Sequence, residues 1–248
     1  FPKKSFKQKI TLANKAYLNI SETMALNLLR LNNRISDKEI MKTMEIEGLD
    51  FLESALDSSK TGIMIYTAHI GNWELIPPIL SSITGRPVNV IARKFTNPMI
   101  ENNIIKPMRN RNNVNLIYKK NSIFKIVKGL KRNEIGGILI DQKQKRKEAI
   151  DIPFFGHIAP TSPTLAMLQI KYNIIAIPMF MVKNDKGTYK FIIKKPINTN
   201  KTSNINSKDI FQLSVKHQQE VEEIINNYPD QWFWMHNRWN IDKKKNVN

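Results

Sequence analysis

The sequence predicts an α/β protein with a central, mostly parallel sheet flanked by helices. After about residue 60, short apolar runs of strand length alternate with stretches of helical periodicity. A chain of 248 residues is long enough to bury the core of such a sheet, and its 41% hydrophobic and 24% charged residues are typical of globular proteins. Sheets of this type bind ligands beyond the carboxyl ends of their strands.

The first 60 residues are predicted to form a helical region that precedes the α/β domain of residues 61–248, with both parts in one structural unit. Residues 18–31 carry apolar side chains at helical spacing. The segment Ser36-Asp-Lys-Glu39 has the form of a capping box, which predicts the start of a second helix.

Strands and helices then alternate along the chain. The apolar runs predict strands at residues 62–67, 88–92, 114–118, 136–140, 174–182 and 188–194. The helical patterns predict helices at residues 72–84, 122–132, 164–171 and 208–227. Asn97-Pro98 is an N-cap and first-turn pair that predicts one further helix.

The net charge of +18 is unusually high and predicts an anionic partner. Nucleic acid, an anionic membrane surface and an acidic protein all meet this condition. Lys is far commoner than Arg, and Asn and Ile are abundant, which is the pattern that AT-rich codons produce. The charge alone therefore does not select one of these partners.

The composition excludes several kinds of site. Without cysteine, the chain has no disulfide, no thiolate metal site and no cysteine nucleophile. The four histidines (His69, His157, His217 and His236) lack metal-ligand spacing, and His217, on a polar helix, is expected at the surface. Motifs for phosphate loops, dinucleotides and serine nucleophiles are absent, so neither a metal nor a cofactor is expected. No run reaches the roughly 18–20 apolar residues of a membrane-spanning helix.

The most informative segment is Tyr66-Thr-Ala-His69-Ile-Gly-Asn-Trp-Glu74. On one continuous helix, His69 and Glu74 would lie about 140° apart on different faces. They meet only if His69 lies in the turn after the strand and Glu74 in the first turn of the next helix. A carboxylate on one imidazole nitrogen would leave the other nitrogen as a base. The alternative is a capping histidine followed by a solvent-exposed glutamate.

Other polar groups also follow predicted strands. Arg93 ends the second strand, where it is suited either to bind phosphate or to stabilise an oxyanion, unless it is an ordinary exposed arginine. Backbone N–H groups near Gly71 are alternative oxyanion donors. Asp141-Gln142 ends the strand at residues 136–140, and the cationic run 143–147 follows it. With no nucleophile in place, a His/Glu pair indicates direct proton abstraction from a substrate hydroxyl.

Aromatic residues concentrate in Phe154-Phe155-Gly156 and in the segment from Trp232 to Trp239. They are suited to core packing, to the wall of an apolar ligand site or to a membrane interface.

Five motifs in this order resemble the bacterial lipid A biosynthesis (lauroyl/myristoyl) acyltransferase family, over residues 45–240. They are Thr67-Ala-His69-Ile-Gly-Asn-Trp-Glu74, Arg93 with Asn97-Pro98, Asp141-Gln142, Phe154-Phe155-Gly156 with Thr161, and Pro229-Asp-Gln-Trp-Phe-Trp-Met-His236-Asn-Arg238-Trp239.

The resemblance implies an O-acyltransferase of lipopolysaccharide synthesis that moves an acyl chain from acyl-carrier protein to a hydroxyl of a Kdo-bearing lipid A precursor. It implies His69 and Glu74 as the catalytic pair. The implied substrate-binding residues are Arg93, Asp141, Gln142, Asn72 and Arg238.

The family acts at the cytoplasmic face of the inner membrane, so a membrane surface is an expected partner and nucleic acid is not. Its members usually begin with a hydrophobic anchor helix, and we expect this sequence to begin after it. Three positions depart from the family pattern: Asp230 replaces a usual Glu, Asn237 a common second Arg, and Thr164 a usual Gly. Asp230 and Asn237 bear on the binding of anionic headgroups by the C-terminal segment, and Thr164 bears on the geometry of the loop after Thr161.

Two other functions are compatible with the residues. A related acyltransferase would use another membrane glycolipid or a lysophospholipid as acceptor, with acyl-CoA as donor. A non-enzymatic protein would use its lysines to bind nucleic acid or an anionic membrane, but the lysines are dispersed and no nucleic-acid motif is present.

Overall fold

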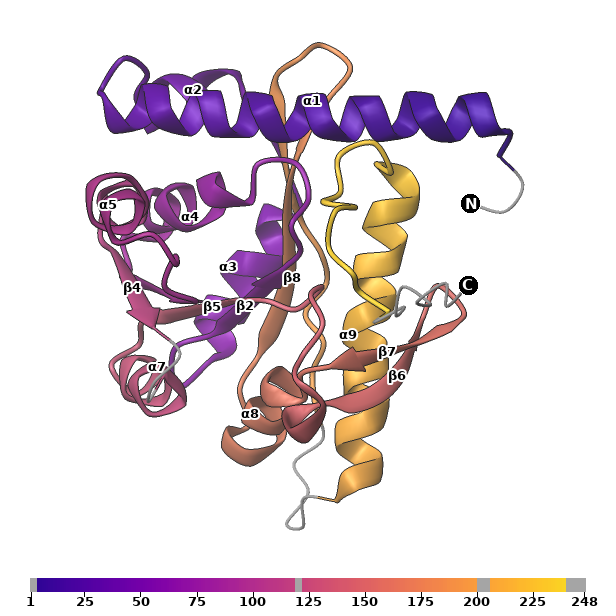
Figure 1. The fold of residues 1–248 in the computed structure, drawn as a ribbon. Coiled ribbons are helices and arrows are strands. Elements are labelled where there is room, and N and C mark those ends of the chain that lie inside the picture. Colours follow the sequence, from indigo (N-terminus) through magenta and orange to yellow (C-terminus); the bar gives the residue numbers. More distant parts are fainter. Residues whose placement is uncertain (1–3, 119–121, 200–205, 240–248) are drawn as a thin grey trace.

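The computed structural model describes residues 4–118, 122–199 and 206–239, and its centre is a seven-stranded sheet (Figure 1). All neighbouring strands of this sheet are parallel except one antiparallel pair, β8 and β9, which confirms the predicted mostly parallel α/β sheet. In spatial order the strands are β1 (Glu45–Glu47), β9 (Tyr189–Ile193), β8 (Ala176–Lys183), β2 (Met64–Thr67), β5 (Ile135–Leu139), β3 (Val88–Ala92) and β4 (Val114–Tyr118).

Helices cover both faces of the sheet because its central strands are apolar on both sides. In β2, Met64 and Tyr66 pack into one core and Ile65 into the other, as the alternation of a strand requires. One core is closed by α2 (Asp37–Thr43), α3 (Leu49–Ser58) and α4 (Ile76–Thr84). The other is closed by α7 (Ser122–Lys131), α8 (Thr164–Tyr172) and α9 (Ser207–Asn227).

The first helix, α1 (Phe6–Leu31), runs across the whole width of the molecule in Figure 1. It begins at Phe6 and not at residue 18 as predicted, because Ser5 and Gln8 form a capping box that starts it earlier. The predicted capping box of Ser36 and Glu39 is present and starts α2. Strand β1 also lies within the first 60 residues and pairs with β9. The division at residue 60 stays a prediction.

Shorter elements complete the chain. The helix predicted at residues 72–84 begins as a separate 3₁₀ turn before α4, and the predicted cap Asn97 accepts hydrogen bonds from Met99 and Ile100. A hairpin that the sequence did not predict has Phe155 and Gly156 at its tip, both with positive φ, as two-residue hairpin turns require. These elements are η1 (Trp73–Leu75), α5 (Pro98–Ile100), η2 (Glu101–Ile105), α6 (Lys106–Arg109), η3 (Arg146–Glu148), β6 (Ile150–Phe154) and β7 (His157–Thr161). Among the described residues, no helix combines the length and the apolarity that crossing a membrane requires.

His217 on α9 corrects a second expectation, because it is buried and not at the surface. Its Nε2 hydrogen bonds with Gln169 Oε1, and its ring centroid lies 5.0 Å from that of Tyr66. Burial lowers the pKa of His217 to about 3.

This buried histidine makes stability depend on pH. The unfolded chain binds the proton near pH 6.5 and the folded protein only near pH 3, so the unfolded state holds more protons in between. His217 is therefore expected to lower the free energy of unfolding by about 1.4 kcal/mol per pH unit as the pH falls below about 6. Urea unfolding of wild type and His217→Gln at several pH values measures this contribution. Equal slopes for the two proteins would contradict it.

Candidate active site

The loop that follows β2 is held by backbone hydrogen bonds on both sides. Gly71 N–H donates to the carbonyl of Gln231 at 3.0 Å, and Asn72 N–H donates to the carbonyl of Met181 at 2.9 Å. The carbonyl of His69 accepts from Phe233 N–H at 2.9 Å. Strand β8 and the C-terminal segment thus fix His69 in the turn after the strand, where the sequence predicted it.

Gly71 allows this close packing. Its φ is +56°, and a Cβ at this position would lie 1.9 Å from the carbonyl oxygen of Met181. Only glycine adopts this conformation without strain and also leaves the space free. The Gly71 and Asn72 N–H groups are already engaged, so these two groups are not free to stabilise an oxyanion.

The carboxylate on His69 belongs to Asp141 and not to Glu74. Asp141 Oδ1 lies 2.7 Å from His69 Nδ1, and Asp141 Oδ2 accepts from the backbone N–H of His69 at 2.9 Å. Trp232 Nε1 also donates to Oδ2, at 2.8 Å. The sequence predicted both His69 and Asp141 at the carboxyl edge of the sheet but did not predict that they pair.

Asp141 is held in its ionised form. Its burial alone would raise the pKa of this carboxyl, but the charge and hydrogen bonds of His69 and the Trp232 indole donor outweigh burial, and the pKa lies below its ordinary value. An ionised carboxylate accepts hydrogen bonds only, so the proton on His69 must lie on Nδ1.

The other ring nitrogen of His69 faces the side chain of Gln142. Gln142 Nε2 lies 3.4 Å from His69 Nε2, and an amide N–H at this position donates to an unprotonated Nε2. Both contacts therefore favour the same tautomer, with Nε2 as the basic atom. The imidazole ring also packs edge-on to Trp73, with 5.0 Å between centroids.

Glu74 lies in η1 and forms an ion pair with Arg109 of α6. Arg109 Nε lies 3.0 Å from each carboxylate oxygen, and Nη2 makes a further contact with Oε1. Trp73 Nε1 donates to the same carboxylate at 3.2 Å. The predicted hydrogen-bonded pair of His69 and Glu74 is thus not formed, although both side chains line one cavity. The Glu74 carboxylate is instead paired with Arg109, which is 35 positions away in the sequence.

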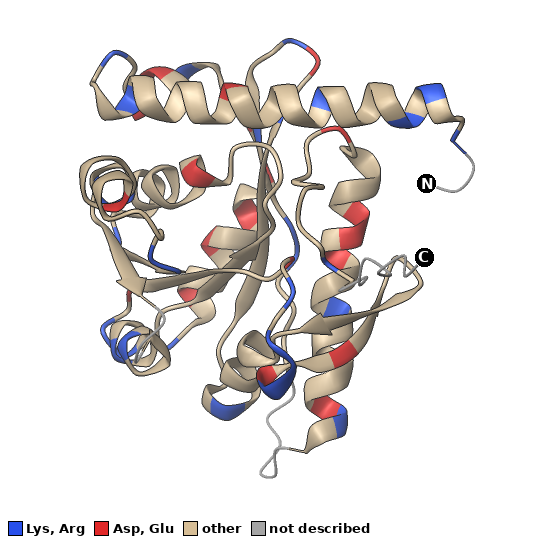
Figure 2. Ribbon diagram, viewed as in Figure 1, with Lys and Arg blue, Asp and Glu red and all other residues tan. Residues whose placement is uncertain are grey.

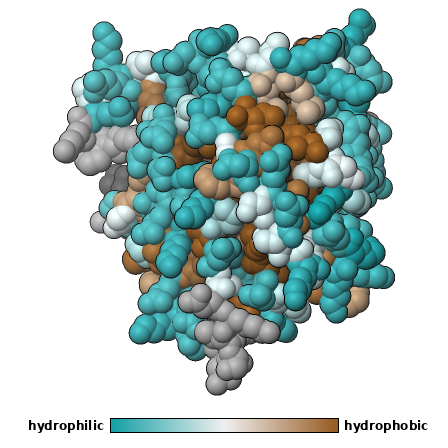
Figure 3. All heavy atoms as spheres, turned by 180° about the vertical axis from the view of Figure 1, so that it is seen from behind, coloured by the Kyte–Doolittle hydropathy of each residue, from teal (hydrophilic) through white to brown (hydrophobic). Residues whose placement is uncertain are grey.

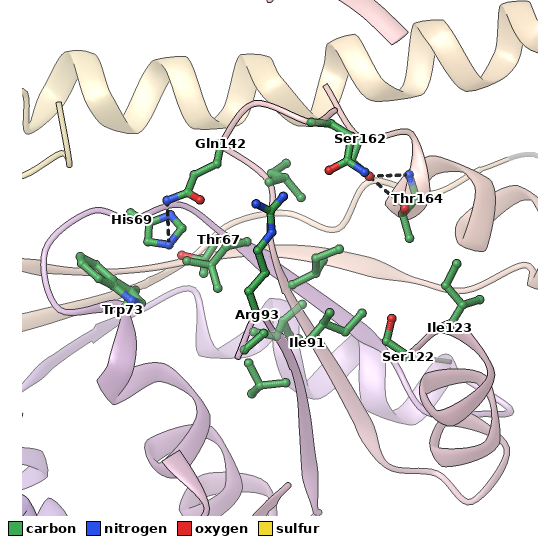
Figure 4. Close-up of a pocket in the computed structure, with 18 of the residues that line it drawn as sticks. Thr67, His69, Trp73, Ile91, Arg93, Ser122, Ile123, Gln142, Ser162 and Thr164 are labelled. Atoms are coloured by element: carbon green, nitrogen blue, oxygen red, sulfur yellow. Dashed lines mark hydrogen bonds between the residues drawn. The ribbon is translucent and has the colours of Figure 1, made fainter. Parts of the chain in front are cut away.

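That cavity has a volume of about 1050 Å³, at the upper end of the range for ligand pockets. His69, Trp73 and Gln142 lie at one end of it, and Ser122, Ile123 and Thr164 at the other (Figure 4). Between them the wall is mostly apolar. Its apolar lining includes Ile65, Val90, Ile91, Ile138, Leu139, Pro163 and Met167.

Arg93 follows β3 and points into this cavity (Figure 4). It makes no hydrogen bond or ion pair with any residue that the structure describes. Its charge is therefore available to a ligand. Lys143, Lys147 and Arg109 also line the cavity, and further cations are spread over α1, α7, α8 and α9 (Figure 2).

Asn72 and Arg238, which were predicted to bind substrate, lie away from the cavity. The Asn72 side chain is buried between Asn27 Nδ2, at 3.1 Å, and the Tyr189 hydroxyl, at 3.5 Å. The buried Arg238 guanidinium donates to Pro160 O at 3.0 Å and to Thr161 Oγ1 at 2.7 Å. Both side chains therefore support the site from within the protein.

Two residues of the site had no predicted role. Arg109 carried no signal, because its partner Glu74 is 35 positions away and α6 is a single short turn. Trp232 stood out only as part of an aromatic cluster, and its indole N–H turns out to hold Asp141. Within the described residues, no group of three or more histidines and carboxylates is arranged to bind a metal ion.

The sequence is similar to known proteins. The family model for bacterial lipid A biosynthesis acyltransferases matches residues 1–241. A lipid A biosynthesis acyltransferase of Haemophilus influenzae is 24% identical over 202 residues, which cover 81% of this chain and 60% of that protein. The chain thus spans about three fifths of the length of this curated relative.

Proposed function

The chain belongs to the bacterial lipid A biosynthesis acyltransferase family, and we propose that it transfers an acyl chain from acyl-carrier protein to a hydroxyl of a Kdo-bearing lipid A precursor. The observation that carries this proposal is a histidine at the end of a large, mostly apolar cavity, with Asp141 on Nδ1 and with Nε2 left as the basic atom. The cavity suits an acyl chain, and the histidine suits the proton transfer that the reaction needs.

His69 is the proposed general base. With Nδ1–H donated to Asp141, Nε2 takes the proton of the acceptor hydroxyl. The oxygen then attacks the thioester carbonyl, and a tetrahedral intermediate forms. Asp141 keeps the ring oriented and stabilises the imidazolium charge, as the carboxylate of a catalytic triad does.

Arg93 is the proposed partner of the developing negative charge. It is the strand-end cation that points into the cavity without a protein partner among the described residues, and the N–H groups of Gly71 and Asn72 are already hydrogen bonded. Collapse of the intermediate forms the ester and releases the carrier thiolate. The thiolate takes the proton from His69 Nε2, so that the enzyme returns to its starting state.

Glu74 has a different proposed role from the one that its spacing suggested. Through Arg109 and Trp73 it fixes the cavity wall beside His69. Replacing Glu74 would leave the Arg109 charge without its partner and would free the Trp73 ring that packs on the imidazole. Glu74 is therefore proposed to be essential to the structure of the site. Gln142 is proposed to contact the substrate atoms that approach His69 Nε2.

The reaction is proposed to occur at the cytoplasmic face of the inner membrane, where a lipid acceptor resides. The charge of +18 suits both an acidic carrier protein and a phosphorylated acceptor. An acyltransferase for another glycolipid or a lysophospholipid, with acyl-CoA as donor, would use the same groups.

Mass spectrometry of the acceptor after incubation separates these functions. The protein is mixed in detergent with a Kdo-bearing lipid A precursor and either acyl-carrier-protein or acyl-CoA thioesters of several chain lengths. The proposal expects a precursor heavier by one acyl chain, and a preference for the carrier protein. Acylation of a lysophospholipid or another glycolipid, with none of the precursor, would overturn the proposed acceptor.

A further inference from the structure

Helix α1 differs from an ordinary surface helix because it buries mostly polar side chains and exposes several large apolar ones. Such a helix normally turns apolar side chains to the core and polar ones to water. In α1, the buried side chains are Ala16, Asn19, Thr23, Asn27 and Arg30. Its exposed large apolar side chains are Phe6, Ile10, Tyr17, Leu18, Met24, Leu28 and Leu29.

The buried polar side chains of α1 form hydrogen bonds within the protein. Asn19 Nδ2 and Thr23 Oγ1 both donate to the carbonyl of Gly71, at 3.4 and 3.1 Å. Asn27 Nδ2 donates to Asn72 Oδ1 at 3.1 Å. The helix therefore keeps its orientation, because rotation would break buried hydrogen bonds and leave their partners unsatisfied.

The apolar face of α1 is correspondingly fixed toward the outside. Leu18 and Met24 are each 63% exposed, and Met24 and Leu28 are one turn apart on one side of the helix. Scattered exposed apolar residues occur on most proteins, and the rear face also carries patches (Figure 3). What distinguishes α1 is that large apolar side chains occur on its exposed side from Phe6 to Leu29, interspersed with polar ones, while four of its five buried side chains are polar.

The charged residues beside this face indicate that its partner is an anionic surface. Lys7, Lys9 and Lys15 are exposed on α1, and Arg34 follows its end. The exposed Glu22 is the acidic residue of α1, and Lys183 binds it at 2.8 Å. A helix with an apolar face and flanking cations matches an anionic lipid surface, where the apolar side chains enter the acyl boundary and the cations meet the headgroups.

We propose that the outer face of α1 docks flat onto an anionic membrane surface. This docking adds a specific surface to the proposed function, which requires only that the protein meets a lipid acceptor. Because the inner face of α1 is hydrogen bonded to Gly71 and Asn72, the same helix links the membrane to the loop that carries His69. A helix is about 10 Å thick, so docking would hold this loop close to the headgroups.

Sedimentation with lipid vesicles tests the docking face. The 248-residue chain is mixed with phosphatidylcholine vesicles with or without phosphatidylglycerol, and the bound fraction is measured without donor or acceptor. We expect binding that is stronger with phosphatidylglycerol and weaker at high salt. The double substitution Met24→Glu/Leu28→Glu should weaken binding by about tenfold or more, since two apolar side chains no longer enter the lipid.

The double substitution Ile158→Glu/Phe211→Glu is the matched control. Ile158 and Phe211 are as exposed as Met24 and Leu28 but lie on β7 and α9, so this variant should bind vesicles like wild type. Circular dichroism and thermal unfolding establish that both variants are folded. Equal vesicle binding by wild type and the α1 variant would overturn the proposal. So would a wild-type dimer that the α1 substitutions dissociate, because a second copy would then cover this face.

Vesicle binding and acyl transfer can be lost separately, so each of the two proposals can fail without the other. His69→Ala should bind vesicles normally although it transfers no acyl chain. A wild-type protein that acylates the precursor in detergent but does not bind vesicles would leave the proposed function intact and refute the docking face.

Discussion

Asp141→Asn is expected to lower kcat for acyl transfer by about 10²- to 10⁴-fold in a folded protein. The asparagine amide would present its N–H₂ group to His69 Nδ1, so this nitrogen would become an acceptor and the ring proton would move to Nε2. The base would then be lost without a change of shape. The asparagine oxygen can still accept from the Trp232 indole and from the His69 backbone N–H.

Steady-state turnover of the lipid precursor measures this effect, and thermal unfolding monitors the fold. Asp151→Asn is the control, because Asp151 is a half-exposed carboxylate that pairs with Arg146 on the hairpin and not with the site. This control should keep wild-type turnover. An Asp141→Asn enzyme with near-normal kcat would refute the orienting role of Asp141.

Gly71→Ala is expected to abolish most activity and to lower the free energy of unfolding by about 2–4 kcal/mol. One part of this loss comes from a positive φ in a residue with a Cβ. The other part comes from the collision of that Cβ with the carbonyl of Met181, which would move the loop away from β8. His69 would shift with the loop.

Gly85→Ala separates the two contributions. Gly85 has a φ of +68°, and a Cβ there would meet no atom within 4 Å. It should therefore lose only about 1–2 kcal/mol and keep its activity. Urea unfolding and turnover of both variants provide the comparison. Equal losses in stability for the two variants would mean that the contact with Met181 does not constrain the loop.

The location of the site could be predicted from the sequence, but the pairing within it could not. Polar residues after apolar runs placed His69, Arg93 and Asp141 at one edge of a parallel sheet, and the structure has them there. The pair of His69 and Asp141 depends on β2 lying next to β5, with Thr67 opposite Leu139. His69 and Asp141 each lie two residues after this pair and are therefore adjacent. Strand order is a property of the whole fold, whereas the spacing of His69 and Glu74 is local and suggested the wrong partner.

The length of the N-terminal helix was underestimated for a related reason. An apolar periodicity predicts a helix when its apolar side faces a core, and α1 instead buries Asn19, Thr23 and Asn27. These side chains are recognisable as core residues only once the loop at Gly71, their hydrogen-bond acceptor, is in place. The same holds for Arg238, because two of its hydrogen-bond partners, Pro160 and Thr161, lie 78 and 77 positions away.

The most direct test of the account is the single-turnover rate of acyl transfer by His69→Ala, with enzyme in excess over the lipid precursor. Under these conditions product release does not limit the rate, so the measurement reports the chemical step. We expect a rate lower than wild type by about 10³-fold or more, in a protein with unchanged thermal unfolding and unchanged vesicle binding. A single-turnover rate near that of wild type would show that another group takes the proton.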